Sequence, residues 1–289
     1  MIIDAHAHLW KEQKGKVDGR DVISLDNGKS DFGGDIRQMM PPYMTDGYNS
    51  VERFIANMDY AGVNGAVITQ EEIDGNQNEY LHEAKNKFPD RIKICSLYLE
   101  NTPVETEGFD GIKLCAGRLK EQNLLKHEEV FALAAEKGMF ISIDLADGAA
   151  QTKELGTLAD KYPELRIAIG HFGMVTRENW LEQIKLAKRS NVYIESGGIT
   201  WLFNSEFYPY PSAIKAIKEA AAVCGTEKLM WGSDYPRTMV EITYKMSFDF
   251  VLKSAELTER EKELFLYKNA ESFYGFDNLR QLPEIKNML

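Results

Sequence analysis

The chain has 289 residues, of which 44% are hydrophobic and 27% are charged, and 45 acidic against 34 basic residues leave a net charge of −11. This composition is typical of a globular protein and excludes collagen-like, coiled-coil and intrinsically disordered chains. The negative charge, together with the lack of a basic cluster, argues against binding of nucleic acid through its phosphates.

The cysteines and the apolar runs bear on location. Cys95, Cys115 and Cys224 form no Cys-x-x-Cys pair, and their odd number fits a reducing compartment. The first residues lack the layout of a signal peptide, and no apolar run approaches the roughly 18 residues that a membrane span needs. We therefore expect a soluble, cytoplasmic protein without a membrane partner, which could assemble as a homodimer.

Short runs rich in Ile and Val alternate with longer amphipathic stretches along nearly the whole chain. The runs predict eight strands, at residues 2–4, 65–69, 92–99, 111–114, 140–144, 166–170, 192–195 and 229–231. Helical patterns lie between them, at residues 51–60, 78–87, 127–136, 152–161, 177–187 and 213–223. Continuous apolar runs are typical of buried parallel strands, and a 3.6-residue period is typical of helices. The short gap after the third run predicts that its helix is vestigial or missing.

Eight strands alternating with helices predict an α/β fold, a (β/α)8 TIM barrel formed by one domain of residues 1–289. A doubly wound open sheet is the competing fold, but no Gly-rich phosphate loop follows the first run. A polar insertion at residues 9–49 follows strand one, where the active-site loops of a barrel belong. An aromatic insertion at residues 197–211 predicts either a packed loop or a substrate wall. The tail from residue 241 predicts helices that cover the outside of the barrel.

The pattern Asp-Ala-His-Ala-His closes the first predicted strand. Because side chains along a strand repeat with period two, His6 and His8 project to the same face. Two imidazoles at the carboxyl end of a strand can bind one divalent metal ion. The alternative is a pair of buried histidines with hydrogen-bond partners.

Two further polar residues follow predicted strands, and two other histidines do not. His171 comes directly after the sixth run, and Asp234 follows the eighth in a Trp-Gly-Ser-Asp-Tyr-Pro segment. In a barrel both side chains lie on the catalytic face, although Asp234 could instead cap a helix. His82 and His127 lie in helical stretches full of Glu and Lys, and we interpret both as solvated surface residues.

These motifs together resemble the amidohydrolase superfamily, and most closely its amidohydrolase-2 branch. The resemblance rests on His-x-His at strand one, Gly-His at residues 170–171 and Gly-Ser-Asp-Tyr-Pro at residues 232–236. The segments at residues 88–91 and 269–275 also look like that branch, so the resemblance covers nearly the whole chain. The branch includes hydrolases, such as a pyrone-dicarboxylate lactonase, and non-oxidative decarboxylases.

The resemblance implies that His6, His8 and Asp234 bind one divalent metal ion, typically zinc. Such a site leaves a position for water, whose pKa the metal lowers towards 7. Asp234 could instead be the base that takes the proton of this water. His171 would then be the catalytic acid or base, or a further ligand.

The sequence departs from the family at strand five, where Asp144 stands in the place of a metal-binding histidine. Asp144 could be a metal ligand that favours harder ions such as manganese, or it could pair with Lys113 at the end of strand four. Lys113 could also bind a substrate carboxylate, for which Arg237 is a better candidate because guanidinium binds carboxylates bidentately. In two-metal members of the superfamily a strand-four lysine is carbamylated and bridges the ions; the resemblance leaves this possibility for Lys113, but the strand-five histidine that it usually works with is missing here. Glu195 and Gln70 also end strands but carry no decisive motif.

Three functions therefore remain open. The leading hypothesis is a metal-dependent hydrolase of a small carboxylated or hydroxylated substrate, such as a lactone or an amide, with Asp234 and His171 in acid–base roles. The second is a non-oxidative decarboxylase of the same family. The third is a barrel that has lost its metal and has a binding role, which the missing strand-five histidine supports.

Overall fold

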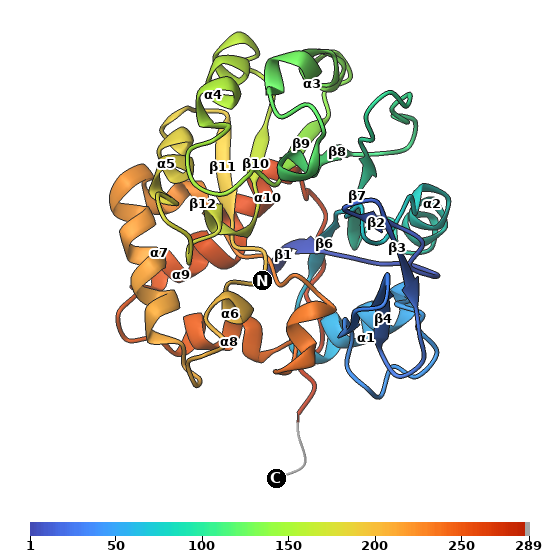
Figure 1. The fold of residues 1–289 in the computed structure, drawn as a ribbon. Coiled ribbons are helices and arrows are strands. Elements are labelled where there is room, and N and C mark those ends of the chain that lie inside the picture. Colours follow the sequence, from blue (N-terminus) through green and yellow to red (C-terminus); the bar gives the residue numbers. More distant parts are fainter. Residues whose placement is uncertain (287–289) are drawn as a thin grey trace.

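The computed structural model of the chain describes residues 1–286, and within them parallel strands form a nearly closed barrel (Figure 1). The strands pair in chain order: β1 (Ile3–Ala7), β6 (Gly65–Ile68), β7 (Ile92–Leu97), β8 (Gly111–Leu114), β9 (Phe140–Ile143), β10 (Ile167–Ile169), β11 (Val192–Glu195) and β12 (Leu229–Met230). The predicted (β/α)8 TIM barrel is therefore confirmed, and each strand lies within a predicted run or overlaps it.

Helices connect most of the strands and surround the barrel. They are α1 (Val51–Ala61), α2 (Asn78–Lys87), α3 (Glu128–Glu136), α4 (Thr152–Lys161), α5 (Leu181–Ile184), α6 (Ile199–Leu202) and α7 (Pro211–Cys224). Residues 98–110, between β7 and β8, form no helix, as the short gap predicted. α5 begins later than predicted because Asn179 has a left-handed backbone (φ +60°), which a helix does not tolerate.

The barrel closes where the first strand meets the segment that follows the last one. The Ala5 amide donates to the Trp231 carbonyl at 2.9 Å, and the His8 amide donates to the Tyr235 carbonyl at 2.8 Å. In the other direction, the Asp234 amide donates to the His6 carbonyl at 2.8 Å. These bonds place the ends of β1 and β12 side by side.

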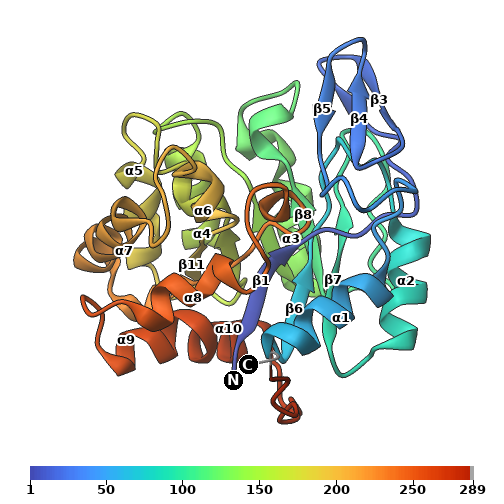
Figure 2. The same cartoon turned by 90° about the horizontal axis from the view of Figure 1, so that it is seen from below.

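The insertion after β1 is not the irregular polar loop that its composition suggested. It forms an antiparallel sheet of β2 (Lys16–Val17), β3 (Arg20–Ser24), β4 (Lys29–Phe32) and β5 (Ile36–Gln38). Figure 2 shows this sheet rising beyond the carboxyl end of β1. It therefore stands beside the barrel mouth, where the prediction placed the insertion.

The tail forms α8 (Met246–Lys253), α9 (Glu259–Glu263) and α10 (Asn269–Tyr274). α8 covers the outside of the barrel, as predicted, and its Phe248 packs on Trp231. α10 departs from that prediction. Its Phe273 and Tyr274 pack on Phe140, the first residue of β9, and Figure 2 shows α10 beside the start of β1. α10 therefore closes the amino end of the barrel, because the apolar residues inside that end need a cover.

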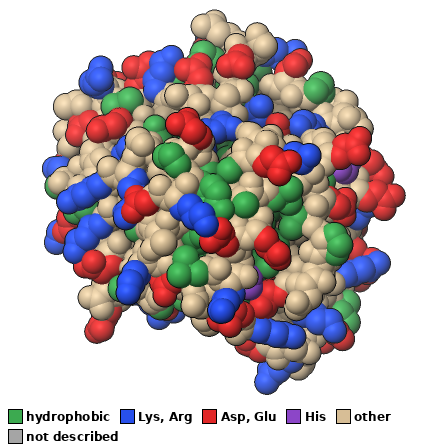
Figure 3. Space-filling view, turned by 90° about the horizontal axis from the view of Figure 1, so that it is seen from above, with side chains coloured by type: hydrophobic (Ala, Val, Ile, Leu, Met, Phe, Trp, Pro, Cys, Tyr) green, Lys and Arg blue, Asp and Glu red, His purple; other side chains and the backbone are tan. Residues whose placement is uncertain are grey.

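The surface carries charges of both signs. Acidic and basic side chains are interspersed over the face shown in Figure 3, and no part of that face is uniformly basic. Among residues 1–286, no helix combines the length and the apolar character that a membrane span requires.

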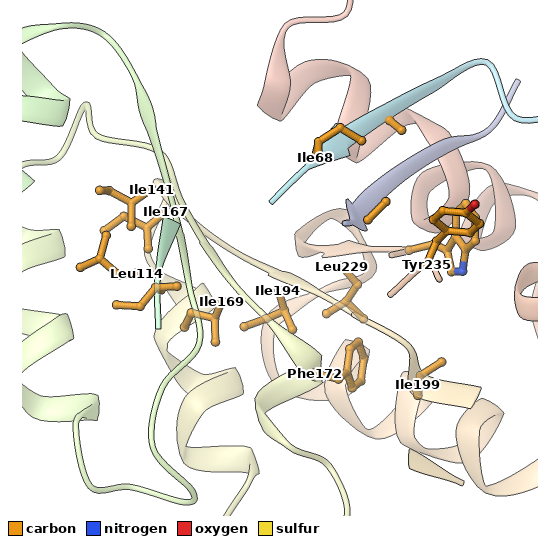
Figure 4. Packing of buried hydrophobic residues seen from close by; sticks show 14 of the residues in the cluster. Ile68, Leu114, Ile141, Ile167, Ile169, Phe172, Ile194, Ile199, Leu229 and Tyr235 are labelled. Atoms are coloured by element: carbon orange, nitrogen blue, oxygen red, sulfur yellow. The ribbon is translucent and has the colours of Figure 1, made fainter. Parts of the chain in front are cut away.

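Apolar side chains on the outer side of the strands form the largest core cluster. Ile141, Ile167, Ile169, Ile194 and Leu229 lie in a row along the sheet (Figure 4), and each is completely buried. Burial of this much apolar surface against the helices is the main force that holds the strands together. The strands therefore present their carboxyl ends on a rigid frame.

Candidate metal centre and active-site cavity

His6 of β1, His8 directly after β1 and one carboxylate from the segment after β12 converge at the carboxyl end of the barrel. His6 Nε2 lies 3.0 Å from His8 Nε2, and His8 Nε2 lies 3.1 Å from Asp234 Oδ1. The third pair, His6 Nε2 and Asp234 Oδ1, is 3.9 Å apart. All three residues are buried. We call this group the metal triplet.

The donor atoms of the metal triplet fit one divalent cation. Zinc binds imidazole nitrogen and carboxylate oxygen at about 2.0–2.2 Å, which in tetrahedral geometry separates neighbouring ligand atoms by about 3.3–3.5 Å. The measured separations of 3.0, 3.1 and 3.9 Å lie on both sides of that range. Two imidazole nitrogens this close repel each other unless a proton or a cation lies between their lone pairs.

Glu195, at the end of β11, orients the ring of His6. His6 Nδ1 and Glu195 Oε1 are 2.6 Å apart, and both side chains are completely buried. Burial and the nearby charges of Lys113 and His171 hold the pKa of His6 well below its usual value, so its ring is neutral. Burial raises the pKa of Glu195 to about 8. A cation at Nε2 of His6 would favour an ionised Glu195 that accepts the proton of Nδ1, the arrangement common for metal-bound histidines.

Asp74 lies behind His8, at a longer distance than Glu195 lies from His6, and no motif in the sequence indicated it. Its Oδ2 lies 3.6 Å from His8 Nδ1, and Gln13 donates to its Oδ1 at 2.7 Å. Burial raises the pKa of Asp74 to about 6. Burial would lower the pKa of His8, but its hydrogen bond with Asp234 and the charge of Asp74 outweigh burial and raise it.

Asp234 is held in place through both carboxylate oxygens. Oδ1 faces His8, and Oδ2 accepts a hydrogen bond of 2.6 Å from Trp201 Nε1 on α6. Its backbone is left-handed (φ +56°), which turns the side chain back over the barrel mouth. Burial opposes ionisation, but the hydrogen bond with His8 and the neighbouring histidines lower the pKa of Asp234 to about 2.

The buried carboxylate of Asp4, below the metal triplet, links β1 to the segment after β12 through hydrogen bonds. Asp4 accepts hydrogen bonds from the Ser233 amide at 2.8 Å and from the Tyr244 hydroxyl at 2.8 Å. Its Oδ2 also accepts from the Ser233 hydroxyl at 2.5 Å. Gly232 is required beside them, because a Cβ there would lie 2.7 Å from His6 Cβ. The Gly-Ser-Asp motif is therefore a close fit of the chain against β1.

His171, after β10, lies next to the metal triplet, with its ring centroid 4.8 Å from that of His6. Its Nδ1 is 2.7 Å from the Gly197 carbonyl and therefore carries a proton, while Nε2 faces Asp144 Oδ2 at 3.6 Å. Burial opposes a charge on the ring, but Asp144 raises the pKa of His171 to about 10. This shift favours the protonated form of the ring at neutral pH.

Asp144, at the end of β9, lies outside the metal triplet and pairs with Lys113. Lys113 Nζ lies 2.7 Å from Asp144 Oδ2, and the lysine side chain is completely buried. Burial alone would raise the pKa of Asp144, but Lys113 and His171 outweigh it and hold the pKa well below its usual range. The structure shows this ion pair, and Asp144 also belongs to two groups of potential metal ligands, so its role as a ligand stays a prediction.

A cavity of about 750 Å³ opens over these residues. Its lining comes from the loops after β1, β6, β8, β9, β10, β11 and β12, and includes His8, Asp144, His171 and Asp234. This volume is within the range of small-molecule sites. The aromatic insertion contributes Trp201 to the wall, and the β2–β5 insertion contributes Arg37 and Met39.

Four arginines line the cavity, and one differs from the rest. Three pair with a carboxylate: Arg37 with Asp35, Arg118 with Glu71 and Arg177 with Asp147, at 2.7, 2.9 and 3.4 Å. Arg237 has no carboxylate within 4.0 Å among residues 1–286. Its guanidinium carbon lies 5.1 Å from the ring centroid of Trp201, and Nη1 lies 3.7 Å from Met39 Sδ. Arg237 is therefore the cation most open to an incoming anion.

The remaining histidines and Gln70 lie away from the metal triplet. The prediction that His127 is a solvated residue was wrong: it is 5% exposed and bonds to the Tyr98 hydroxyl at 2.8 Å. His82 is half-buried and packs on Phe109. Gln70 is buried and donates to the Cys95 carbonyl at 2.7 Å, a structural contact between neighbouring strands.

Comparisons with known proteins identify a family for the chain. A family model described as Amidohydrolase matches residues 3–276, nearly the whole chain. A search of curated proteins gives no match. Many solved structures share the fold.

Three of these structures are informative. A probable 2-pyrone-4,6-dicarboxylic acid hydrolase from Acinetobacter baumannii, with citric acid bound, is 19% identical with a TM-score of 0.67, covering 95% of this chain and 99% of its own. An amidohydrolase from Burkholderia multivorans with bound zinc is 12% identical with a TM-score of 0.70, covering 95% and 99%. The 5-carboxyvanillate decarboxylase from Novosphingobium aromaticivorans, complexed with manganese and 4-hydroxy-3-methoxy-5-nitrobenzoic acid, is 20% identical with a TM-score of 0.54, covering 79% and 81%. At these identities the likeness shows the shared fold.

Proposed function

Since this chain belongs to the amidohydrolase family and is an enzyme of the hydrolase or lyase type, we propose that it is a metal-dependent hydrolase of a small carboxylated or hydroxylated substrate, such as a lactone or an amide. The observation that carries the proposal is the convergence of His6, His8 and Asp234, of which His8 and Asp234 line a cavity of about 750 Å³. The zinc bound to the relative from Burkholderia multivorans supports zinc as the ion. The manganese in the decarboxylase makes manganese the alternative.

When bound to the metal triplet, the ion supplies positive charge that acidifies water and polarises a carbonyl group. Asp234 is placed to accept the proton of the attacking water, because its carboxylate is ionised and faces the cavity. Trp201 holds Oδ2 of Asp234 in position during this transfer. Glu195 orients the ring of His6 from behind, and the carboxylate of Asp74 lies 3.6 Å from Nδ1 of His8.

On the opposite side of the metal triplet, His171 is the proton donor of the proposed reaction. Its Nδ1 is committed to the Gly197 carbonyl, so Nε2 is the atom that can protonate a leaving alkoxide or amine. Asp144 stabilises the protonated ring, and Lys113 balances the charge of Asp144. General acid–base catalysis of this kind typically contributes 10²–10⁴-fold in rate.

Arg237 is the proposed anchor for a carboxylate of the substrate. Its guanidinium projects at the cavity next to Trp201 without a carboxylate partner among residues 1–286, whereas the other three cavity arginines each have one. A substrate carboxylate could bind the guanidinium of Arg237 in bidentate geometry and neutralise its charge. The relatives that bind citric acid and a nitrobenzoic acid support an acidic substrate.

The experiment is a substrate screen on protein of known metal content. The purified protein is analysed for bound metal and tested on panels of carboxylated lactones, amides and hydroxybenzoates. We expect about one zinc per chain and turnover of a lactone or an amide. Release of carbon dioxide from a hydroxybenzoate, without hydrolysis, would replace the proposal by the decarboxylase that the relative from Novosphingobium aromaticivorans suggests. A chain with neither metal nor turnover would favour a binding role.

A further inference from the structure

Lys113 brings a positive charge into the barrel right beside the metal triplet. Its side chain is completely buried at the end of β8, and Asp144 is its ion-pair partner at 2.7 Å. A buried ammonium needs a compensating charge, because its desolvation is expensive. Lys113 therefore depends on Asp144, and the carboxylate of Asp144 is engaged by Lys113.

Asp144 is also the residue shared by two other groups of potential ligands. Within the described residues, donor atoms of His6, Asp144 and His171 lie close enough to hold a cation, as do those of Glu71, Cys115 and Asp144. Because His6 already belongs to the metal triplet, a second ion beside it would depend on Asp144 and His171. Both groups adjoin the cavity, and neither is complete without Asp144. Any second ion at this end of the barrel would therefore have to bind Asp144.

The ammonium and a second ion would compete for the same carboxylate oxygen. Oδ2 of Asp144 faces both Lys113 Nζ, at 2.7 Å, and His171 Nε2, at 3.6 Å. The carboxylate lies closely over Gly170, where a Cβ would come within 2.0 Å of its Oδ1. A second divalent ion bound to Asp144 would therefore lie next to the ammonium of Lys113, inside a buried site where like charges repel strongly.

We propose that Lys113 is the second cation of this centre. Its ammonium occupies the charge position that a second divalent ion would otherwise take, restricts the centre to one ion, and keeps a latent metal position at Asp144 and His171 closed. The proposal rests on the proposed metal triplet of His6, His8 and Asp234, but it does not depend on which reaction the enzyme catalyses.

The test is the number of metal ions bound by Lys113→Met, which removes the charge and keeps an unbranched side chain. Proteins are equilibrated with excess zinc, freed of unbound zinc by gel filtration and analysed by elemental analysis, with calorimetric titration beside it. We expect one equivalent in the wild type and two in Lys113→Met. The matched control is Lys262→Met, because Lys262 is another buried lysine paired with a carboxylate, Glu259 at 2.8 Å, outside the site. It should stay at one equivalent.

The double variant Lys113→Met/Asp144→Asn lacks both the ammonium and the latent ligand, so it should return to one equivalent. A single equivalent in folded Lys113→Met, or two in the wild type, would overturn the proposal. If Lys113→Met does not fold, anomalous diffraction from wild-type crystals soaked in manganese decides. A peak at the metal triplet alone supports the proposal, and a second peak beside Asp144 and His171 refutes it.

These readouts separate this proposal from the proposed reaction. Suppose that the bound ions rise from one in the wild type to two in Lys113→Met, and that the protein turns over no lactone or amide. This result would support the proposal for Lys113 and contradict the proposed hydrolase function. A wild type without an ion at His6 and His8 would instead remove the metal triplet on which both proposals rest.

Discussion

On the β1–β12 side of the barrel mouth, the donor atoms of His6, His8 and Asp234 lie within 3.9 Å of one another. On the β8–β10 side, Asp144 meets a lysine of the chain itself, 2.7 Å away. The first side has carboxylates behind its histidines and needs a positive charge from outside, whereas the second side carries its own. If both proposals hold, one half of the barrel mouth binds an external ion at His6, His8 and Asp234, and the other half has its own cation, Lys113, beside Asp144.

The largest effect is expected from the external-ion half. His6→Ala/His8→Ala removes both nitrogen ligands, so bound metal should be lost and kcat/KM should fall by about 10³-fold or more, since such an ion is worth several kcal/mol in the transition state. Metal analysis and kinetics measure the two together. His82→Ala, on α2 away from the cavity, is the control. Full metal content in the double variant would place the ion elsewhere.

Substitutions in the half that contains Lys113 and Asp144 should change the free energy of unfolding. Asp144→Asn leaves the buried Lys113 ammonium unpaired, and removal of one partner of a buried pair costs about 3–5 kcal/mol in the free energy of unfolding. Urea denaturation measures this loss, and the double variant Lys113→Met/Asp144→Asn should recover most of it. An unchanged stability together with weaker zinc binding would instead make Asp144 a metal ligand.

A smaller effect on the first half is expected from the carboxylate behind His6. Glu195→Gln keeps the shape but removes the charge that orients the ring, and such changes lower metal affinity by about 10–100-fold. Competition with a fluorescent zinc chelator measures the affinity. The variant Glu128→Gln breaks a surface ion pair between Glu128 of α3 and Lys161 of α4, and it should bind zinc as the wild type does. Equal affinities in the two variants would deny Glu195 a role in the site.

The smallest effect concerns the arginines above both halves. Arg237→Met should raise KM for a carboxylated substrate about 10-fold and change kcat little, because a hydrogen bond to a charged group contributes about 1.5–3 kcal/mol. Arg177→Met, which removes an arginine already paired with Asp147, should raise KM less. The reverse order would assign the carboxylate to Arg177.

The parts of this molecule that the sequence predicted are those encoded locally. Apolar runs marked the strands, and polar residues directly after them marked the mouth, so His6, His171 and Asp234 could be placed together before the structure was known. The sequence did not predict the β2–β5 sheet, because its short, half-exposed strands show no apolar run. His127 was misjudged because its partner, Tyr98, is 29 residues away.

The supporting residues of the site could not be predicted for the same reason. Asp74, on the loop after β6, and Trp201, on the short helix α6, reach His8 and Asp234 from segments whose direction depends on tertiary packing. Glu195 was visible as a strand end, but nothing nearby in the sequence indicates that it faces His6. Asp144 marked a departure from the family, and only the fold revealed Lys113 as its partner among the alternatives.

Because the barrel closes between β1 and β12, the metal triplet also bears on the stability of the closed barrel. His6 and Asp234 come from opposite ends of the chain and meet only when the ring is shut, with Asp4 bonded to Ser233 across the seam. An ion that binds all three residues binds the closed ring alone, so the free energy of binding is added to that of closure. A metal ion bound at the proposed centre would therefore also stabilise the closed barrel, and the melting temperature should rise with metal concentration.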